Sequence, residues 1–112
     1  MGWFGGEVLQ TQNRVPGEYE SLTVGAEAVT LSPDKIKPLS GSYAGLAARA
    51  ALLSLEAGDI RFRLDGGAPS GVSGHYLASG DTLVLAETQT LEKFQAIRVG
   101  EVSATLQVTY FY

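Results

Sequence analysis

The chain has 112 residues, 45% of them hydrophobic and 18% charged, and it carries a net charge of −4 at pH 7. This length and composition predict one globular domain, and an acidic chain without a basic block excludes sequence-independent binding to nucleic acid. The lack of cysteine excludes disulfide bonds and thiolate chemistry.

The apolar stretches of the chain are too short to cross a membrane. The longest runs from Leu46 to Leu55 and is interrupted by Arg49 and Ser54, whereas a membrane helix needs about 20 apolar residues. The apolar residues 1–6 have no basic region before them, which argues against a secretory signal peptide. We therefore expect no membrane partner.

Residues 1–18 show no period typical of a helix or a strand, and we interpret them as an N-terminal arm in front of a β-domain at residues 19–112. Apolar side chains on such an arm would favour aggregation in water unless they were covered. We predict that the arm docks on a neighbouring subunit, where it would also protect an edge strand. The alternative is that it folds back onto its own domain. The docking residues would be Trp3, Phe4, Val8 and Leu9.

Two short strands are expected between Tyr19 and Thr30. A turn follows at Ser32-Pro33-Asp34, because proline fixes its own φ and aspartate bonds to the nearby backbone.

Residues 47–56 are ambiguous, since their alanines and leucines favour a helix. The alternative is a strand that forms a hairpin with residues 59–65, in which apolar and charged side chains alternate. A tight turn at Ala57-Gly58 would place apolar side chains of both strands on one face, where their pairing outweighs a local propensity. We predict the strand and the hairpin, with the cross-strand pairs Leu55–Ile60, Leu53–Phe62 and Ala51–Leu64.

The rest of the chain is typical of short strands separated by glycine turns. A loop at 66–74 leads to an edge strand at 75–77, a strand at 82–85, a helical turn at 90–94 capped by Thr90, a strand at 96–99 with Ile97 and Val99 inward, and a last strand at 104–111. Seven or eight short strands at spacings of roughly 8–12 residues predict an all-β fold, an antiparallel β-sandwich or jelly roll.

No set of residues indicates catalysis or metal binding. His75 is the single histidine, so a zinc site would lack further ligands, and no serine stands in a nucleophile-elbow sequence. Four carboxylates could form a glycosidase pair or bind calcium, but most lie at turns, where aspartate is expected for backbone reasons. We expect no enzyme activity, no cofactor and no metal. The four carboxylates are those of Glu56, Asp59, Asp65 and Asp81.

Arg61 and Arg63 share one face of the alternating stretch. Two arginines on a sheet surface could bind a carboxylate or a glycan, contact another subunit, or remain a solvated face. A glycan-binding sandwich would also show aromatic side chains in loops, for which Tyr43 and Tyr76 are the candidates. We keep Arg61 and Arg63 as candidate interface residues.

Several segments of the second half together resemble a known family. They are Gly58 to Gly66 (Gly-Asp-Ile-Arg-Phe-Arg-Leu-Asp-Gly), Pro69-Ser70, Gly74-His75, Gly80-Asp81, Phe94 with Ile97-Arg98-Val99, and Ala104 to Tyr110. In this set the chain resembles small structural proteins encoded among the capsid and tail genes of tailed bacteriophages. Residues 1–45 have no counterpart in that family.

The resemblance implies a virion component with a small β-sandwich fold and no catalytic residues. The nearest role is that of a decoration (cement) protein on the capsid shell, made in the cytoplasm of the bacterial host and located in the virion. A neck or tail accessory protein and a glycan-binding module are the alternatives. The expected partners are phage capsid or tail proteins and further copies of the chain, as a trimer or a dimer.

Overall fold

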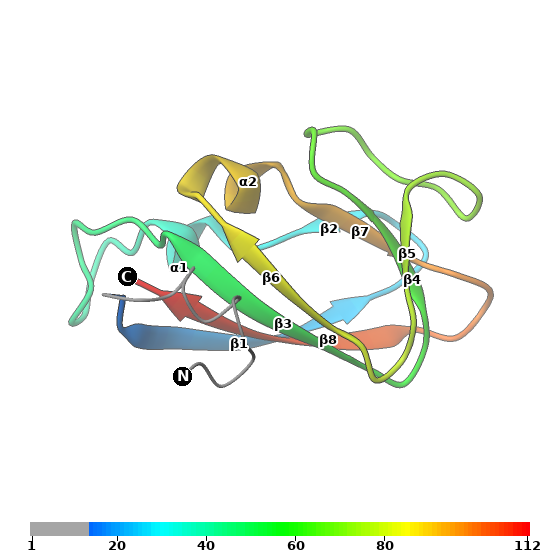
Figure 1. The fold of residues 1–112 in the computed structure, drawn as a ribbon, viewed down its shortest axis with the longest axis horizontal. Coiled ribbons are helices and arrows are strands. Elements are labelled where there is room, and N and C mark those ends of the chain that lie inside the picture. The colour runs from blue at the N-terminus through cyan, green and yellow to red at the C-terminus, as the bar shows by residue number, and fades with distance from the viewer. Residues whose placement is uncertain (1–13) are drawn as a thin grey trace.

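The computed structural model describes residues 14–112 and shows two antiparallel sheets packed face to face (Figure 1). The first sheet has the strand order β1 (Pro16–Val24), β8 (Ala104–Phe111), β3 (Ala50–Glu56) and β6 (Thr82–Ala86). The second has the order β2 (Val29–Thr30), β7 (Gln95–Arg98), β4 (Ile60–Arg63) and β5 (His75–Leu77). The predicted all-β sandwich is confirmed.

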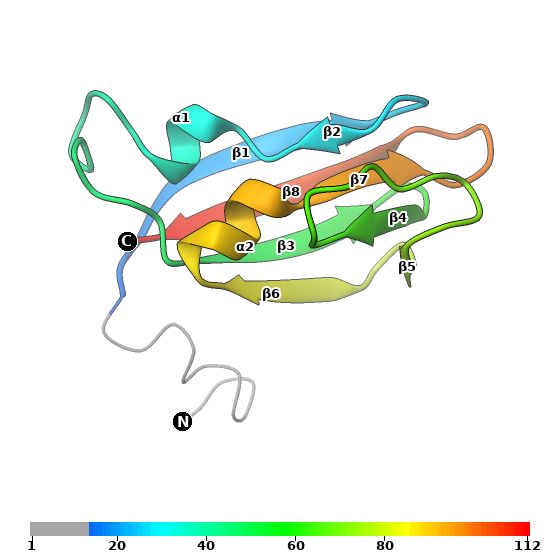
Figure 2. The ribbon, with the colours of Figure 1, turned by 90° about the horizontal axis from the view of Figure 1, so that it is seen from above.

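Two short helices, α1 (Pro33–Ile36) and α2 (Thr88–Lys93), cover the part of the first sheet that the shorter second sheet leaves open (Figure 2). Each turns one buried side chain into the core, Ile36 from α1 and Leu91 from α2. Within residues 14–112, no helix is long and apolar enough to cross a membrane.

The connectivity is that of one long hairpin rolled into a sandwich. β1 pairs with β8, β2 with β7, β3 with β6 and β4 with β5, so the first four strands run back along the last four. Rolling the hairpin then brings β8 beside β3 and β7 beside β4. Eight strands paired in this nested way form a jelly roll.

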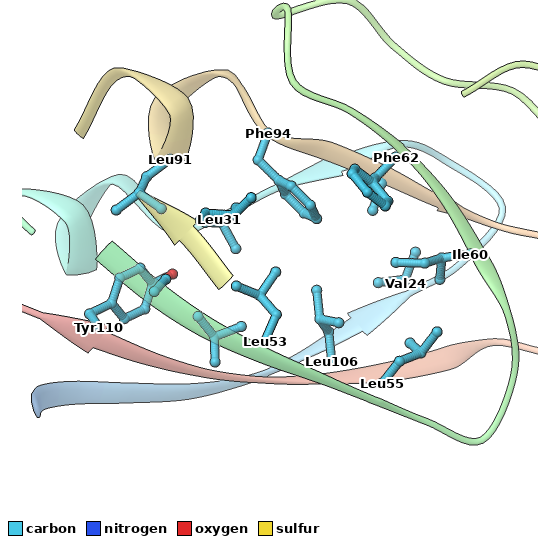
Figure 3. Close-up of a cluster of buried hydrophobic side chains, with 14 of the residues drawn as sticks. Val24, Leu31, Leu53, Leu55, Ile60, Phe62, Leu91, Phe94, Leu106 and Tyr110 are labelled. Atoms are coloured by element: carbon cyan, nitrogen blue, oxygen red, sulfur yellow. The ribbon is translucent and has the colours of Figure 1, made fainter. Parts of the chain in front are cut away.

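Apolar side chains from both sheets and both helices meet in one core between the sheets (Figure 3). Leu106, Val108 and Tyr110 alternate inward along β8, as the sequence predicts, and none of the three is exposed. Burial of such a side chain contributes roughly 1.5–3 kcal/mol relative to leaving it in water. The core therefore stabilises the fold without help from disulfides.

The predicted hairpin between residues 47–56 and 59–65 is wrong, although the first of these segments is a strand and not a helix. β3 pairs with β6 and β8, and β4 pairs with β5 and β7. Residues 57–59 therefore carry the chain from one sheet to the other. The expected pairs Leu55–Ile60, Leu53–Phe62 and Ala51–Leu64 are not cross-strand neighbours.

The same six side chains nevertheless share the core. Five of them are buried, and Leu64 packs against the core half-buried. The apolar alternation looks the same whether two strands share one face or oppose each other across a core. The period of two thus places side chains correctly and leaves the sheet assignment open.

Two local expectations also need correction. The helical turn begins at Thr88 rather than Thr90, with Glu87 at the N-cap position, and the Thr88 hydroxyl donates a hydrogen bond to the Ala48 carbonyl oxygen (2.7 Å). In β7, Ala96 is the buried residue and Ile97 is half-buried, as is Val99, which directly follows the strand. Ala96 lies opposite Phe62, whose ring centre is 5.7 Å from that of Phe94, so a larger inward side chain would compete with these rings for space.

The first strand begins inside the range interpreted as an arm. β1 starts at Pro16, and the backbone of Val15 exchanges two hydrogen bonds with that of Tyr112 (3.0 and 2.9 Å). Residues 14–18 therefore belong to the edge of the first sheet. Four of the predicted interface residues, Trp3, Phe4, Val8 and Leu9, lie outside the described residues, so their docking stays a prediction.

Candidate functional site

Arg63 projects from β4 and holds the loop that follows this strand, residues 64–74. Its guanidinium donates two hydrogen bonds to the Asp65 carboxylate (3.0 and 2.6 Å) and one to the Ala68 carbonyl oxygen (3.2 Å). The Arg63 hydrogen bonds and a further one from the Gly67 N–H lower the pKa of Asp65 to about 2. Gly67 lies so close that a Cβ there would be 2.6 Å from the guanidinium.

Arg61 holds the far part of the same loop. It donates hydrogen bonds to the carbonyl oxygens of Gly71 (3.2 Å) and Gly74 (2.9 Å), and its guanidinium carbon lies 5.2 Å from the centre of the Tyr76 ring. Tyr76 donates its hydroxyl hydrogen bond to Asp59, which lowers the pKa of Asp59 and raises that of Tyr76. Both candidate interface arginines are thus engaged with groups of their own chain.

The loop presents one apolar side chain at its tip. Ser70 and Ser73 exchange backbone hydrogen bonds (2.9 and 3.3 Å) around Gly71 and Val72. Val72 is 89% exposed. A loop whose backbone is ordered before contact loses less entropy on binding, so this tip is suited to meet a partner.

The four carboxylates that the sequence singles out are engaged separately. Glu56 accepts a hydrogen bond from Gln107 (3.2 Å), Asp81 accepts one from the Ala78 N–H (3.0 Å), and Asp59 and Asp65 have the partners given above. In the described part of the chain, no group of three metal-ligating side chains comes together.

His75 is exposed on the edge strand β5, with its ring centre 5.4 Å from that of Phe62. This is the rim position that the sequence indicates for the single histidine.

At the opposite end of the molecule, two stacked tyrosines hold the loop between α1 and β3, residues 37–49. The ring centres of Tyr43 and Tyr112 are 4.6 Å apart, with planes inclined by 20°. Tyr112 donates its hydroxyl hydrogen bond to the Lys35 carbonyl oxygen, and burial raises the pKa of Tyr112 to about 12. Gly17 of β1 lies under the pair, where a Cβ would be 2.7 Å from the Tyr43 ring.

A carboxylate faces inward at this same end. Glu20 of β1 accepts hydrogen bonds from the hydroxyl (2.6 Å) and the N–H (3.2 Å) of Ser32, and another from the Tyr110 hydroxyl. Burial and the hydrogen bond to Glu20 raise the pKa of Tyr110 well above its ordinary value. The Glu20 carboxylate therefore satisfies the hydrogen-bond donors of Tyr110 in β8 and of Ser32 before α1, which is a structural role.

The loop held by the tyrosines exposes Leu39, at 89%, and Leu46, at 52%. A hollow of about 490 Å³ opens beside Leu39, and the salt bridge between Lys37 and Glu92 (3.0 Å) lies at it. Exposed apolar side chains next to a hollow are typical of a surface that contacts another protein. The apolar residues around the hollow are Leu31, Pro33, Ile36 and Leu39.

The fold and these surfaces define a jelly-roll domain that carries exposed apolar side chains on loops at its two ends. No protein-family model matches the chain, and no curated protein or solved structure matches it significantly. The function therefore has to be inferred from the residues of the chain and their arrangement.

Sequence reasoning did not single out Leu39 or Val72. For Val72 a signal was present, because one valine among glycines and serines (Ser70 to Gly74) has no alternating neighbours with which to be buried. The stack of Tyr43 on Tyr112 had no local signal, because it joins residues far apart in the sequence.

Proposed function

We propose that this protein is a non-enzymatic structural component of a tailed-phage virion, a capsid decoration protein. It binds the shell, and further copies of itself, through the loops at the two ends of its jelly roll. The observation that carries this proposal is the exposure of apolar side chains at both ends of a domain whose candidate carboxylates and arginines are engaged internally. A neck or tail accessory protein would use similar contacts and differs in its partner.

The apolar loop residues form two separate contact regions. Val72 and Val102 lie on loops at one end, where they are 89% and 65% exposed, and Leu39 and Leu46 lie at the other (Figure 1). A domain with a contact region at each end can join two neighbours, which a protein that reinforces a shell must do. Contact between unlike ends of successive copies also produces a ring when the rotation closes, as in a trimer.

The fold supports the proposal by analogy. Jelly rolls recur in viral capsid and lectin domains. Because one fold serves many functions, the analogy adds less weight than the exposed side chains do.

The proposal is tested by co-sedimentation of the purified protein with empty capsid shells and with tails of the phage whose genome encodes it. We expect saturable binding to shells and none to tails. Leu39→Asp and Val72→Asp should each weaken binding by about tenfold or more, since burying such a side chain contributes roughly 1.5–3 kcal/mol. Thr23→Asp is the matched control, because it adds the same charge at an exposed position on the outer face of the first sheet.

Two results would contradict this function. Binding to tails alone would make the protein a tail accessory component. Failure to bind either particle, together with a monomeric mass at high concentration in sedimentation equilibrium, would refute a virion role and self-association together.

Tyr76 favours a second candidate, a glycan-binding module. Tyr76 is 50% exposed, and its side chain lies beside the Asp59 carboxylate and the Arg61 guanidinium, an arrangement in which a sugar could stack on the ring and hydrogen-bond to the charged groups. Binding of oligosaccharides that is lost in Tyr76→Ala and kept in Val72→Asp would support this candidate. Equal binding by both variants would remove it.

A further inference from the structure

The outer face of the first sheet, which points away from the core, is polar at one end. Tyr19 donates its hydroxyl hydrogen bond to Gln107, and Gln107 donates one to Glu56 (3.2 Å), so that β1, β8 and β3 are linked across the face. The register places small polar side chains around this chain of hydrogen bonds, which suits contact with water. They are Ser21, Thr23, Ser54, Thr82 and Thr105.

The other end of this face is apolar. The register places Phe111 of β8 opposite Ala50 of β3, Ala50 opposite Ala86 of β6, and Leu52 opposite Val84. These five residues are called the outer apolar patch. Phe111 is 8% exposed and Ala50 is not exposed at all. Because Phe111 points to the opposite side of β8 from the core, the core side chains are not what covers it.

The N-terminal part of the chain enters beside this patch. Val15 pairs with Tyr112, the residue after Phe111. The Arg14 side chain donates a hydrogen bond to the carbonyl oxygen of Arg49, the residue before Ala50 (2.8 Å). The chain that precedes Arg14 therefore starts at the border of the patch, and it contains large apolar side chains at positions 3, 4, 8 and 9 as well as Met1.

We propose that residues 1–13 of the same chain cover the outer apolar patch, with Trp3, Phe4, Val8 and Leu9 making the apolar contact. From β8 to β6 the patch crosses two strand spacings, about 10 Å. Thirteen extended residues reach roughly 40 Å, so the segment is long enough. This inference goes beyond the virion role and does not depend on it.

Tethering favours the chain's own segment over that of a neighbouring subunit. A segment attached at the border of its binding surface has an effective concentration of roughly millimolar or more. In the unassembled protein, a neighbour's segment has only the concentration of the protein in solution. The reach estimated above allows the chain's own segment to bind first, and the mixing experiment below tests whether a neighbour's segment replaces it.

Trp3 is the single tryptophan of the chain, so its fluorescence reports on this segment in the full-length protein. We expect blue-shifted emission and weak quenching by acrylamide, both unchanged on dilution. Leu52→Asp, and independently Val84→Asp, should shift the emission to the red and raise the quenching constant several-fold, because a carboxylate would meet the apolar segment. Thr23→Asp, at the polar end of the same face, should leave both readings unchanged.

A mixing experiment separates the chain's own patch from a neighbour's. Leu52→Asp keeps Trp3 and has a damaged patch, whereas Trp3→Ala keeps the patch and has no tryptophan. If the segment binds its own chain, mixing the two leaves the red-shifted emission as it was. Recovery of blue-shifted emission would overturn the proposal in favour of docking on a neighbouring subunit. Free quenching of Trp3 in the unmutated protein, or no response to either patch variant in folded protein, would overturn it outright.

Discussion

The loop at residues 37–49 and the loop at residues 64–74 lie at opposite ends of the jelly roll, and each exposes one apolar side chain to 89%, Leu39 in the first and Val72 in the second. The first loop is held by the stack of Tyr43 on Tyr112. The second is held by two arginines of β4 that bind its carbonyl oxygens and one carboxylate. An exposed apolar side chain is thus carried by a loop that an aromatic contact holds at one end of the molecule and that charged hydrogen bonds hold at the other.

The difference follows from the composition of the two loops. Residues 64–74 include four glycines and no aromatic side chain, so the strand has to supply the anchoring groups, and arginine has enough donors to reach several carbonyl oxygens. Residues 37–49 include Tyr43, which can pack on the sheet by itself. A loop without large side chains is held by side chains of the adjacent strand. The conformation of residues 64–74 therefore depends on the charged state of the groups that form these hydrogen bonds. The stack of Tyr43 on Tyr112 is the aromatic anchor, and Arg61 and Arg63 with their hydrogen bonds are the charged anchor. Substitutions and changes of pH should affect the two anchors separately.

Phe62→Ala should have the largest effect, because it weakens the core on which both anchors rest. Phe62 is buried, stacks on Phe94 and lies in the strand that carries both arginines. We expect a loss of about 3–5 kcal/mol in the free energy of unfolding, measured by urea denaturation, with both loops loosened together. Val72→Ala, at the exposed loop tip, should stay within about 0.5 kcal/mol. A loss below about 1 kcal/mol for Phe62→Ala would contradict its place in the core.

Gly17→Ala should disturb the aromatic anchor alone. The added Cβ would lie 2.7 Å from the Tyr43 ring and 2.8 Å from that of Tyr112, so the stack must move. Overpacking of this kind costs about 1–3 kcal/mol. Gly25→Ala is the matched control, since its Cβ would meet nothing closer than the Ser103 hydroxyl oxygen at 3.8 Å. Equal stability of the two variants would show that the stack is not fixed over Gly17.

Alkaline pH should weaken the aromatic anchor. The pKa of Tyr112 is raised to about 12 in the folded protein, chiefly by burial, from an ordinary value of 10.0. A raised pKa means that this contribution to stability is complete below pH 10 and is lost as the pH rises towards 12. The urea midpoint should therefore fall over this range, and less steeply in Tyr112→Phe. An identical slope in that variant would assign the fall to other groups, of which Tyr110 is the first to examine.

Acidic pH should loosen the charged anchor and leave the aromatic one in place. The pKa of Asp65 is lowered from 3.8 to about 2, first by the hydrogen bond from Arg63. A lowered pKa means that the contribution is present above pH 4 and is lost as the pH falls from 4 to 2. Amide NMR signals of Gly67 and Ala68 should shift over this range, and Asp65→Asn should show the loosened loop already at neutral pH. Signals that do not move between pH 4 and 2 would contradict the anchor.

Chelation of divalent ions should not change the thermal stability of the protein. The carboxylates of the 64–74 loop region already have protein partners, Arg63 for Asp65 and Tyr76 for Asp59. Thermal unfolding curves with and without EDTA should therefore coincide. A lower midpoint with EDTA would revive a calcium site at Asp59, Asp65 or their neighbours, and calcium titration of the EDTA-treated protein would then show a rise in the midpoint.

Much of the sandwich follows from the period of two, as β8 shows, whose limits are those that the alternation predicts. The pairing of β3 with β6 and β8 could not be predicted, because inward side chains alternate alike in a hairpin and in two opposed sheets. The outward position of Arg61 and Arg63 was also predictable, but their partners were not. Apart from the Asp65 carboxylate, those hydrogen-bond partners are carbonyl oxygens whose direction depends on the backbone of the loop, including the positive φ of Gly66 (89°) and Gly74 (123°).

The nested pairing of the strands has a consequence for folding during synthesis on the ribosome. β1 is the first strand of the sandwich to be synthesised, yet its partner β8 is the last, and among the eight strands β4 and β5 alone pair with their immediate successor or predecessor. Until β8 has left the exit tunnel, the nascent chain carries β1 and β3 with open edges and an uncovered apolar face. Strand pairs that are far apart in the sequence form late and slowly, and until they form the chain is prone to aggregation. The yield of native protein therefore depends on how long the growing chain is shielded, which makes synthesis rate and chaperone supply the controlling variables in its production.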